Sequence, residues 1–148
     1  MINSQNKDGY TALHLAIICE KKKNNCKTSN LEIFYNLLYS GADINLLNKY
    51  KETPLHLALK HGFGVIIILL LYNGADFNIK DSKKKTPLKI AEDYEAEEVI
   101  YTLLDCGAKI SSGPLLAQSS LRKIVKKWEK NNVEERNRVM SELIQFKK

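Results

Sequence analysis

The chain has 148 residues, of which 44% are hydrophobic and 27% are charged, and its net charge is +6. This length suits one domain with a sizeable core. Three cysteines without ligand spacing, Cys19, Cys26 and Cys106, argue against a disulfide framework and suit a reducing compartment. The polar start of the chain predicts no signal peptide, and the ten apolar residues at 63–72 fall short of the ~20 that span a bilayer.

A six-residue phrase occurs three times, as TALHLA at 11–16, TPLHLA at 53–58 and TPLKIA at 86–91. Its threonine can accept a hydrogen bond from a free N–H group of a first helical turn. Proline suits the next position, because a missing N–H costs nothing there. A histidine three residues after the threonine can reach back to the start of the turn, as in a capping box. Each phrase therefore predicts the start of a helix.

A second apolar segment follows each phrase and ends in Gly-Ala, at Gly41, Gly74 and Gly107. Its apolar residues recur at helical spacing, as in Leu31, Phe34 and Leu38 of the first copy. Glycine takes the left-handed conformation after a helix end at little cost. We therefore expect a second helix in each copy, ending at these glycines.

The spacing shows that the copies share one period. The phrases of copies two and three begin at positions 53 and 86, which sets a period of 33. The interval from the threonine to the glycine is the same in these two copies, but it is nine positions longer in copy one. The polar segment at 21–29 predicts that this insertion forms a surface loop between the two helices of copy one. A period near 33 is typical of a stacked repeat protein that presents a binding surface.

These residues resemble the ankyrin repeat family, whose T-P-L-H-x-A and G-A-D-x-N patterns both occur in the chain. The resemblance covers about residues 6–110 and implies an all-α solenoid of helix-turn-helix repeats, joined by β-turn or hairpin loops, at about 6–45, 48–78 and 81–110. Copy three departs from the pattern at Lys89 and Lys109, and copy one at Ala12, as terminal repeats commonly do.

Residues 111–148 do not match the repeat. Apolar residues at helical spacing predict two amphipathic helices, with stripes at Leu121, Ile124, Val125 and Trp128 and at Val139, Met140, Leu143 and Ile144. We expect this tail to cap copy three, and a separate partner-binding module is the alternative. The tail holds nine basic and four acidic residues, so most of the net charge lies there.

The turn tips carry positive charge. By the family pattern a left-handed residue stands at Gly9, Lys51 and Lys84, where a non-glycine residue costs about 1–2 kcal/mol. Either these turns bear the strain or they adopt another shape. The lysines predict a contact with an acidic partner, and a solvated edge is the plainer interpretation.

The resemblance places partner contacts at the tips and at the exposed end of each first helix. These positions are Lys7, Asp8, Tyr10, Ile18 and Cys19 in copy one, Lys49, Tyr50, Glu52, Lys60 and His61 in copy two, and Ser82, Lys83, Lys85, Asp93 and Tyr94 in copy three. Among them we expect Tyr10, Tyr50 and Tyr94 to be the anchors, since aromatic side chains often dominate interface energies.

Copy two has a further apolar feature. Val65 and Ile68 stand where the family usually has charged, outward residues, so we expect them exposed near Phe63 as a patch. The insertion of copy one or the tail could cover them.

The sequence predicts no chemistry. The three histidines form no catalytic set, no phosphate-binding loop or metal-ligand spacing occurs, and we expect no cofactor and no metal. We expect a monomeric, cytoplasmic module that binds another protein. The alternative is an adaptor or effector whose basic tail binds a second partner, nucleic acid or an anionic membrane. The abundant Lys, Ile and Asn have AT-rich codons, and in an intracellular microbe or virus the host cytosol would be the site of action.

Overall fold

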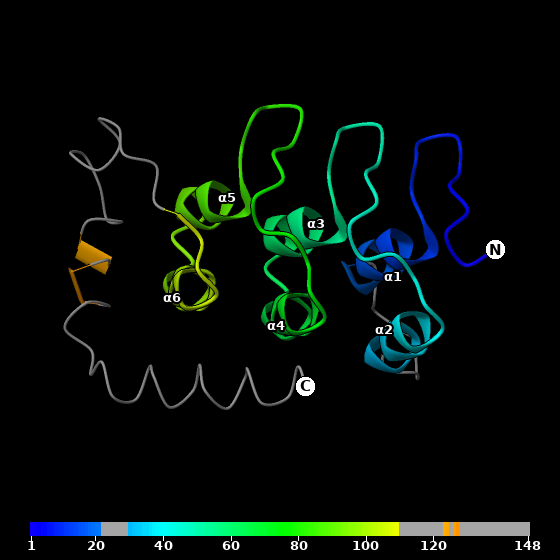
Figure 1. The fold of residues 1–148 in the computed structure, drawn as a ribbon, viewed down its shortest axis with the longest axis horizontal. Coiled ribbons are helices and arrows are strands. Elements are labelled where there is room, and N and C mark those ends of the chain that lie inside the picture. The colour runs from blue at the N-terminus through cyan, green and yellow to red at the C-terminus, as the bar shows by residue number, and fades with distance from the viewer. Residues whose placement is uncertain (22–29, 110–122, 125, 128–148) are drawn as a thin grey trace.

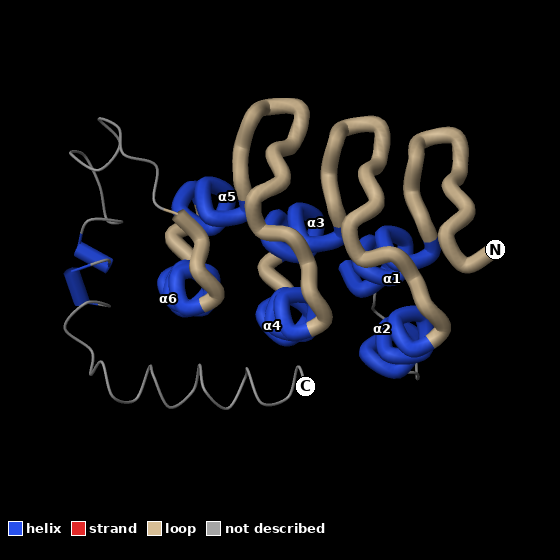
Figure 2. Tube along the Cα trace, in the orientation of Figure 1, coloured by secondary structure: helices blue, strands red, loops and turns tan. Residues whose placement is uncertain are grey.

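The computed structural model describes residues 1–21, 30–109, 123, 124, 126 and 127. Across this described part there are six helices and no strand: α1 (Ala12–Lys21), α2 (Asn30–Tyr39), α3 (Pro54–His61), α4 (Gly64–Tyr72), α5 (Pro87–Asp93) and α6 (Glu97–Asp105). Figure 1 shows three helix pairs side by side, with α1, α3 and α5 in one row and α2, α4 and α6 in the other. Three long loops project from the first row (Figure 2). The predicted all-α repeat solenoid is confirmed.

The first helix of each pair begins as the phrase predicts. The hydroxyl of Thr53 accepts from the His56 N–H at 3.4 Å, and Nδ1 of His56 accepts from the Thr53 N–H at 3.1 Å, which is a reciprocal capping box. Thr11 and His14 make the same two bonds, at 3.4 and 3.2 Å. In copy three Lys89 replaces the histidine, and only the bond from its N–H to the threonine remains, at 3.3 Å.

The second helices end as predicted, because Gly41, Gly74 and Gly107 all have left-handed φ angles of 84–97°. A second left-handed position, between the two helices of a pair, was missed. It is Gly62 in copy two, with φ 72°, and Glu95 in copy three, with φ 51°. The two positions are equivalent, since they are separated by one full repeat period.

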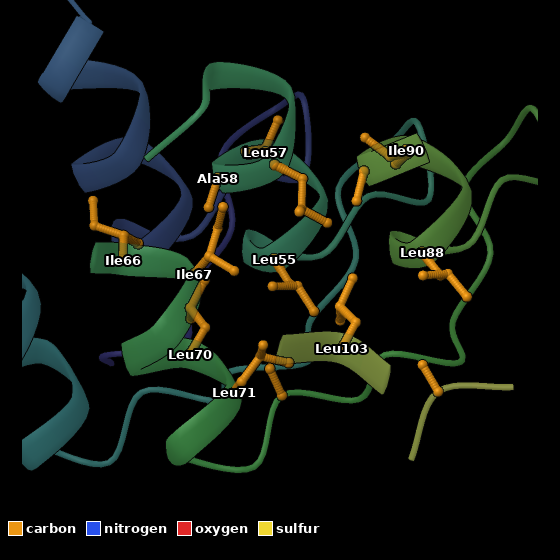
Figure 3. Close-up of a cluster of buried hydrophobic side chains, with 14 of the residues drawn as sticks. Leu55, Leu57, Ala58, Ile66, Ile67, Leu70, Leu71, Leu88, Ile90 and Leu103 are labelled. Carbon is orange, nitrogen blue, oxygen red and sulfur yellow. The ribbon is translucent and has the colours of Figure 1, made fainter. Parts of the chain in front are cut away.

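The core is a continuous apolar layer between the two rows of helices. In Figure 3 the side chains of α3, α4, α5 and α6 point into one shared interior. Stacking buries what a single repeat leaves open: Leu57 is 6% exposed and Ile90 is 2% exposed, whereas Leu15, at the same position of copy one, is 41% exposed. The preceding repeat covers this position in copies two and three, so each repeat depends on its neighbour for burial.

The two non-repeat segments are only partly described. Helix α1 continues to Lys21, two residues beyond Cys19, and the rest of the predicted insertion, 22–29, lies outside the described residues. In the tail, Ile124 is buried in the same core cluster, and Lys127 Nζ lies 2.8 Å from Glu97 Oε1 of α6. These contacts are consistent with the predicted cap. The rest of the first predicted tail helix and all of the second lie outside the described residues.

Candidate functional site

One side chain organises each turn tip. The Oδ1 atom of Asn48 accepts hydrogen bonds from the N–H groups of Tyr50 and Glu52, both at 2.9 Å. Asn6 and Asp81 hold their tips in the same way, accepting from the residues two and four positions later at 2.9–3.0 Å. The three tips therefore share one shape, fixed by an Asn or Asp at its first residue.

Backbone hydrogen bonds join neighbouring tips into a row. The Lys49 N–H donates to the Asp8 carbonyl at 3.0 Å, and the Ser82 N–H donates to the Tyr50 carbonyl at 2.9 Å. At Gly9 an added Cβ would lie 2.9 Å from the Lys49 nitrogen, so this tip requires glycine for space as well as for its φ of 78°. The side chains on the row are consequently presented as one surface.

The lysines at the second and third tips adopt the strained left-handed backbone conformation. Lys51 and Lys84 have φ angles of 57° and 60°, so both turns keep the left-handed shape that Gly9 adopts in copy one. A lysine at such a position costs about 1–2 kcal/mol relative to an ordinary backbone conformation. The tips are therefore strained at the positions that also carry their positive charge.

The surface of the second tip combines charge and an aromatic ring. Lys49 forms an ion pair with Asp8 of the first tip, and its Nζ lies 5.0 Å from the centroid of the Tyr50 ring. The hydrogen bond to Asp8 is the main reason that the pKa of Lys49 is raised. Tyr50 stays exposed, so the cation lies near the ring without covering it.

Glu52 was predicted to contact a partner, but the structure places it beneath the tips rather than on the surface. Its side chain is buried, at 7% exposure for the residue, accepts from Asn48 Nδ2 at 2.8 Å and pairs with Lys60. Lys60 also lies 3.5 Å from Asp81 of the next tip. Burial opposes the charge of Lys60, but the two carboxylates outweigh it and its pKa is raised. Glu52 and Lys60 therefore tie copies two and three together beneath the tips.

Copy three uses the same two positions with the charges reversed. Lys85 and Asp93 stand one repeat period after Glu52 and Lys60, and they form an ion pair. Asp93 also accepts from Lys89 at 3.3 Å, and these lysines hold its pKa below the usual value although burial acts in the opposite direction. Lys85 is thus a neutralised cation rather than a free one.

The remaining predicted residues divide by exposure. Lys7, Ser82, Lys83 and Tyr94 are exposed, as is Cys19, while Asp8, Ile18 and His61 are half-buried. The His61 ring lies 5.7 Å from that of Phe63. Tyr10 is half-buried with its ring edge-on to His14 at 5.9 Å, so of the three predicted anchors only Tyr50 and Tyr94 stand free on the surface.

Uncompensated positive charge is concentrated on the tips. Lys7, Lys51, Lys83 and Lys84 are exposed, and within the described residues none of them has an ion-pair partner. Lys80, just before the third tip, is also exposed and has no ion-pair partner among the described residues. The tips therefore present a row of free lysines, and among the described residues of the tips Lys49 and Lys85 are already paired, with Asp8 and Asp93.

The two phrase histidines serve the fold. His14 and His56 are fully buried, and burial lowers the pKa of each, so both rings are neutral at pH 7. Because Nδ1 accepts from a backbone N–H, the proton must be on Nε2, which in His14 donates to the Glu52 carbonyl at 3.1 Å. His14 thus links copy one to copy two, as its role at the helix start predicts.

The outer face carries the expected apolar residues and more. Val65 and Ile68 are exposed on α4 as predicted, whereas Phe63 is half-buried against the core. Sequence reasoning missed the exposed tyrosines of the same face, Tyr35 and Tyr72. The repeat period was the available signal, because it places Tyr35 level with Ile68.

Within the described residues no group of three or more His, Cys, Asp or Glu side chains could hold a metal ion. In the same part of the chain, every helix is too short or too polar to cross a membrane. What the surface offers is a row of charged and aromatic side chains on tips that backbone hydrogen bonds join.

Two comparisons with known proteins agree with this geometry. A family model described as ankyrin repeats in three copies matches residues 24–113. The chain is similar to the nuclear factor NF-kappa-B p105 subunit of Gallus gallus, with 38% identity over 70 residues. Those residues are 47% of this chain and 6% of that protein, so the chain resembles a small part of a much longer relative.

Proposed function

Because the chain belongs to the ankyrin repeat family, whose repeats are generally protein–protein interaction modules, we propose that it binds a partner protein through its turn tips and the concave face beside them. The partner's contact surface is acidic. The observation that carries this proposal is the row of exposed lysines at the tips, which have no ion-pair partner among the described residues.

The charge argument depends on which lysines are free. Lys49, Lys60 and Lys85 are already paired with carboxylates of the chain. Lys83 and Lys84 are exposed and can meet carboxylates of a partner without breaking an internal pair. Such charges act mainly by steering association, and their effect falls as salt rises.

Tyr50 and Tyr94 supply the apolar contribution. Both rings are exposed, at 46% and 60%, and Nζ of Lys49 lies 5.0 Å from the centroid of the Tyr50 ring. An aromatic side chain has few rotatable bonds, so it loses little entropy on binding and commonly acts as a hot spot. We therefore assign the steering to the lysines and the residence time to the tyrosines.

The adaptor alternative rests on the basic tail, and one contact weighs against it. Lys127 pairs with Glu97 of α6, and Ile124 is buried in the repeat core. At least this part of the tail is engaged with the repeats and supports a cap.

Affinity capture with matched baits tests the proposal. The wild-type chain, a Lys83→Glu/Lys84→Glu variant and a Lys109→Glu/Lys126→Glu control are used on one lysate, followed by quantitative mass spectrometry. The two variants change the net charge equally, and all four lysines are exposed. We expect a set of acidic proteins that the tip variant loses and the control retains.

Kinetics on a captured partner separate the two roles. The tip variant should associate about tenfold more slowly at low salt, and Tyr50→Ala should dissociate about tenfold faster. If the control variant loses the same proteins as the tip variant, or if neither change alters the kinetics, the tips are not the binding surface.

A further inference from the structure

The three turn tips differ in charge although they share one shape. The residues at 5–10 hold one lysine and one acidic residue, and those at 47–52 hold two lysines and one acidic residue. Those at 80–85 hold four lysines and one acidic residue, so the net charges of the three loops are 0, +1 and +3. The loops stand side by side in the order of the repeats (Figure 2). The row of tips is therefore graded, and its positive end is at copy three.

Two equivalent positions change from apolar to basic between copies two and three. Leu47 and Tyr50, here called the apolar tip, are 40% and 46% exposed. One repeat period later stand Lys80 and Lys83, which are both exposed. Because the two loops have the same shape, the second loop offers an apolar contact at the positions where the third offers a cationic one.

The positive charge of the third loop is not cancelled by the carboxylates beside it. Oδ1 of Asp81 accepts from the N–H groups two and four positions later, at 2.9 and 3.0 Å, and its Oδ2 lies 3.5 Å from Lys60. Asp93 is paired with Lys85. Three exposed lysines remain without an ion-pair partner among the described residues and are here called the basic tip: Lys80, Lys83 and Lys84.

The apolar tip and the basic tip lie about one repeat apart. The Ser82 N–H donates to the Tyr50 carbonyl at 2.9 Å, so the two loops are directly joined. Packed helices of neighbouring repeats lie ~10 Å apart, and an extended segment covers this distance in about three residues, at ~3.3 Å each. The Debye length at physiological salt is ~8 Å. A partner's carboxylates must therefore lie at the third loop itself to gain from its charge.

We propose that the partner is recognised in two parts. An extended segment of the partner places an apolar side chain against the apolar tip and a cluster of carboxylates, about three residues away, against the basic tip. This inference rests on the proposed function, and it adds the motif that the partner carries and the direction in which it lies along the row. Evenly spread acidic charge fits the row less well, because the loop at 5–10 has no net charge.

Selection from a phage-displayed library of random linear peptides tests the motif. The baits are the wild-type chain, Lys83→Glu/Lys84→Glu and Leu47→Ser/Tyr50→Ser. The wild type should enrich peptides in which an apolar residue stands about three positions from a group of acidic residues. The first variant should no longer select the acidic residues, and the second should no longer select the apolar residue. All four positions are exposed, so the fold should be little affected, which circular dichroism checks.

Fluorescence anisotropy on an enriched peptide then compares two equal reversals of charge. Lys83→Glu/Lys84→Glu should weaken binding at least about tenfold, whereas Lys7→Glu/Lys51→Glu should weaken it at most about threefold, because these lysines lie farther from the carboxylates. The two variants are matched, since all four lysines are exposed and each pair includes one left-handed residue, Lys51 or Lys84.

The outcomes separate this inference from the proposed function. Peptides with acidic residues but no associated apolar residue, or equal losses of affinity in the two charge variants, would overturn the two-part motif and leave the acidic partner standing. If the wild type enriches no peptide, or if its peptides bind both bait variants equally well, then neither the motif nor the tips as a binding surface survives.

Discussion

Replacing Lys84 by glycine should stabilise the protein, although it removes a side chain. Lys84 has a φ of 60°, and the equivalent residue of copy one is glycine. A left-handed non-glycine residue costs about 1–2 kcal/mol, while glycine gives back about 0.5–1 kcal/mol through the greater entropy of the unfolded chain. The net gain should be about 0.5–1 kcal/mol. Little else is lost, because the Lys84 side chain is exposed and has no ion pair in the described part of the chain.

Lys83 is the matched control, since it is the same residue type, is equally exposed and has no positive φ. Lys83→Gly should therefore lower the free energy of unfolding by about 0.4–1 kcal/mol. Urea unfolding followed by far-UV circular dichroism measures both, and Lys84→Gly should raise the melting temperature by ~1–4 °C. Effects of the same sign in the two variants would refute the assignment of strain to the left-handed turn.

Three further outcomes follow from the buried groups. Burial lowers the pKa of His14 and His56, so the unfolded chain binds more protons than the folded chain below about pH 6.5. The free energy of unfolding should therefore fall as the pH falls, by up to ~1.4 kcal/mol per pH unit for each histidine. The urea midpoint should be lower at about pH 5.5 than at about pH 7.5, and His56→Gln should reduce this difference. Lys60→Met strands two buried carboxylates and should cost about 3 kcal/mol, whereas Lys49→Met, on an exposed pair, should leave the midpoint unchanged. Ile124→Ala should cost about 2 kcal/mol, and an unchanged midpoint would argue against the cap.

Local rules were enough to predict the frame of the fold. The threonine and histidine of each phrase bond to their own turn, so Thr53 and His56 could be placed from a few residues of sequence. The glycine stops depend on single-residue conformations, and so do Lys51 and Lys84, whose left-handed turns follow from the match to Gly9. These features are fixed within a few residues of the chain and need no distant partner.

Exposure and charge pairing were decided by stacking. Glu52 looks like a surface residue in sequence, but Lys60 lies against it and the next tip closes over both. Leu15 and Leu57 are both flanked by His and Ala in the sequence, but Leu15 is exposed and Leu57 is buried. They differ because a preceding repeat packs against Leu57 and none packs against Leu15. A repeat sequence therefore determines its own helices and turns, while the adjacent repeat determines which of its side chains remain available to a partner.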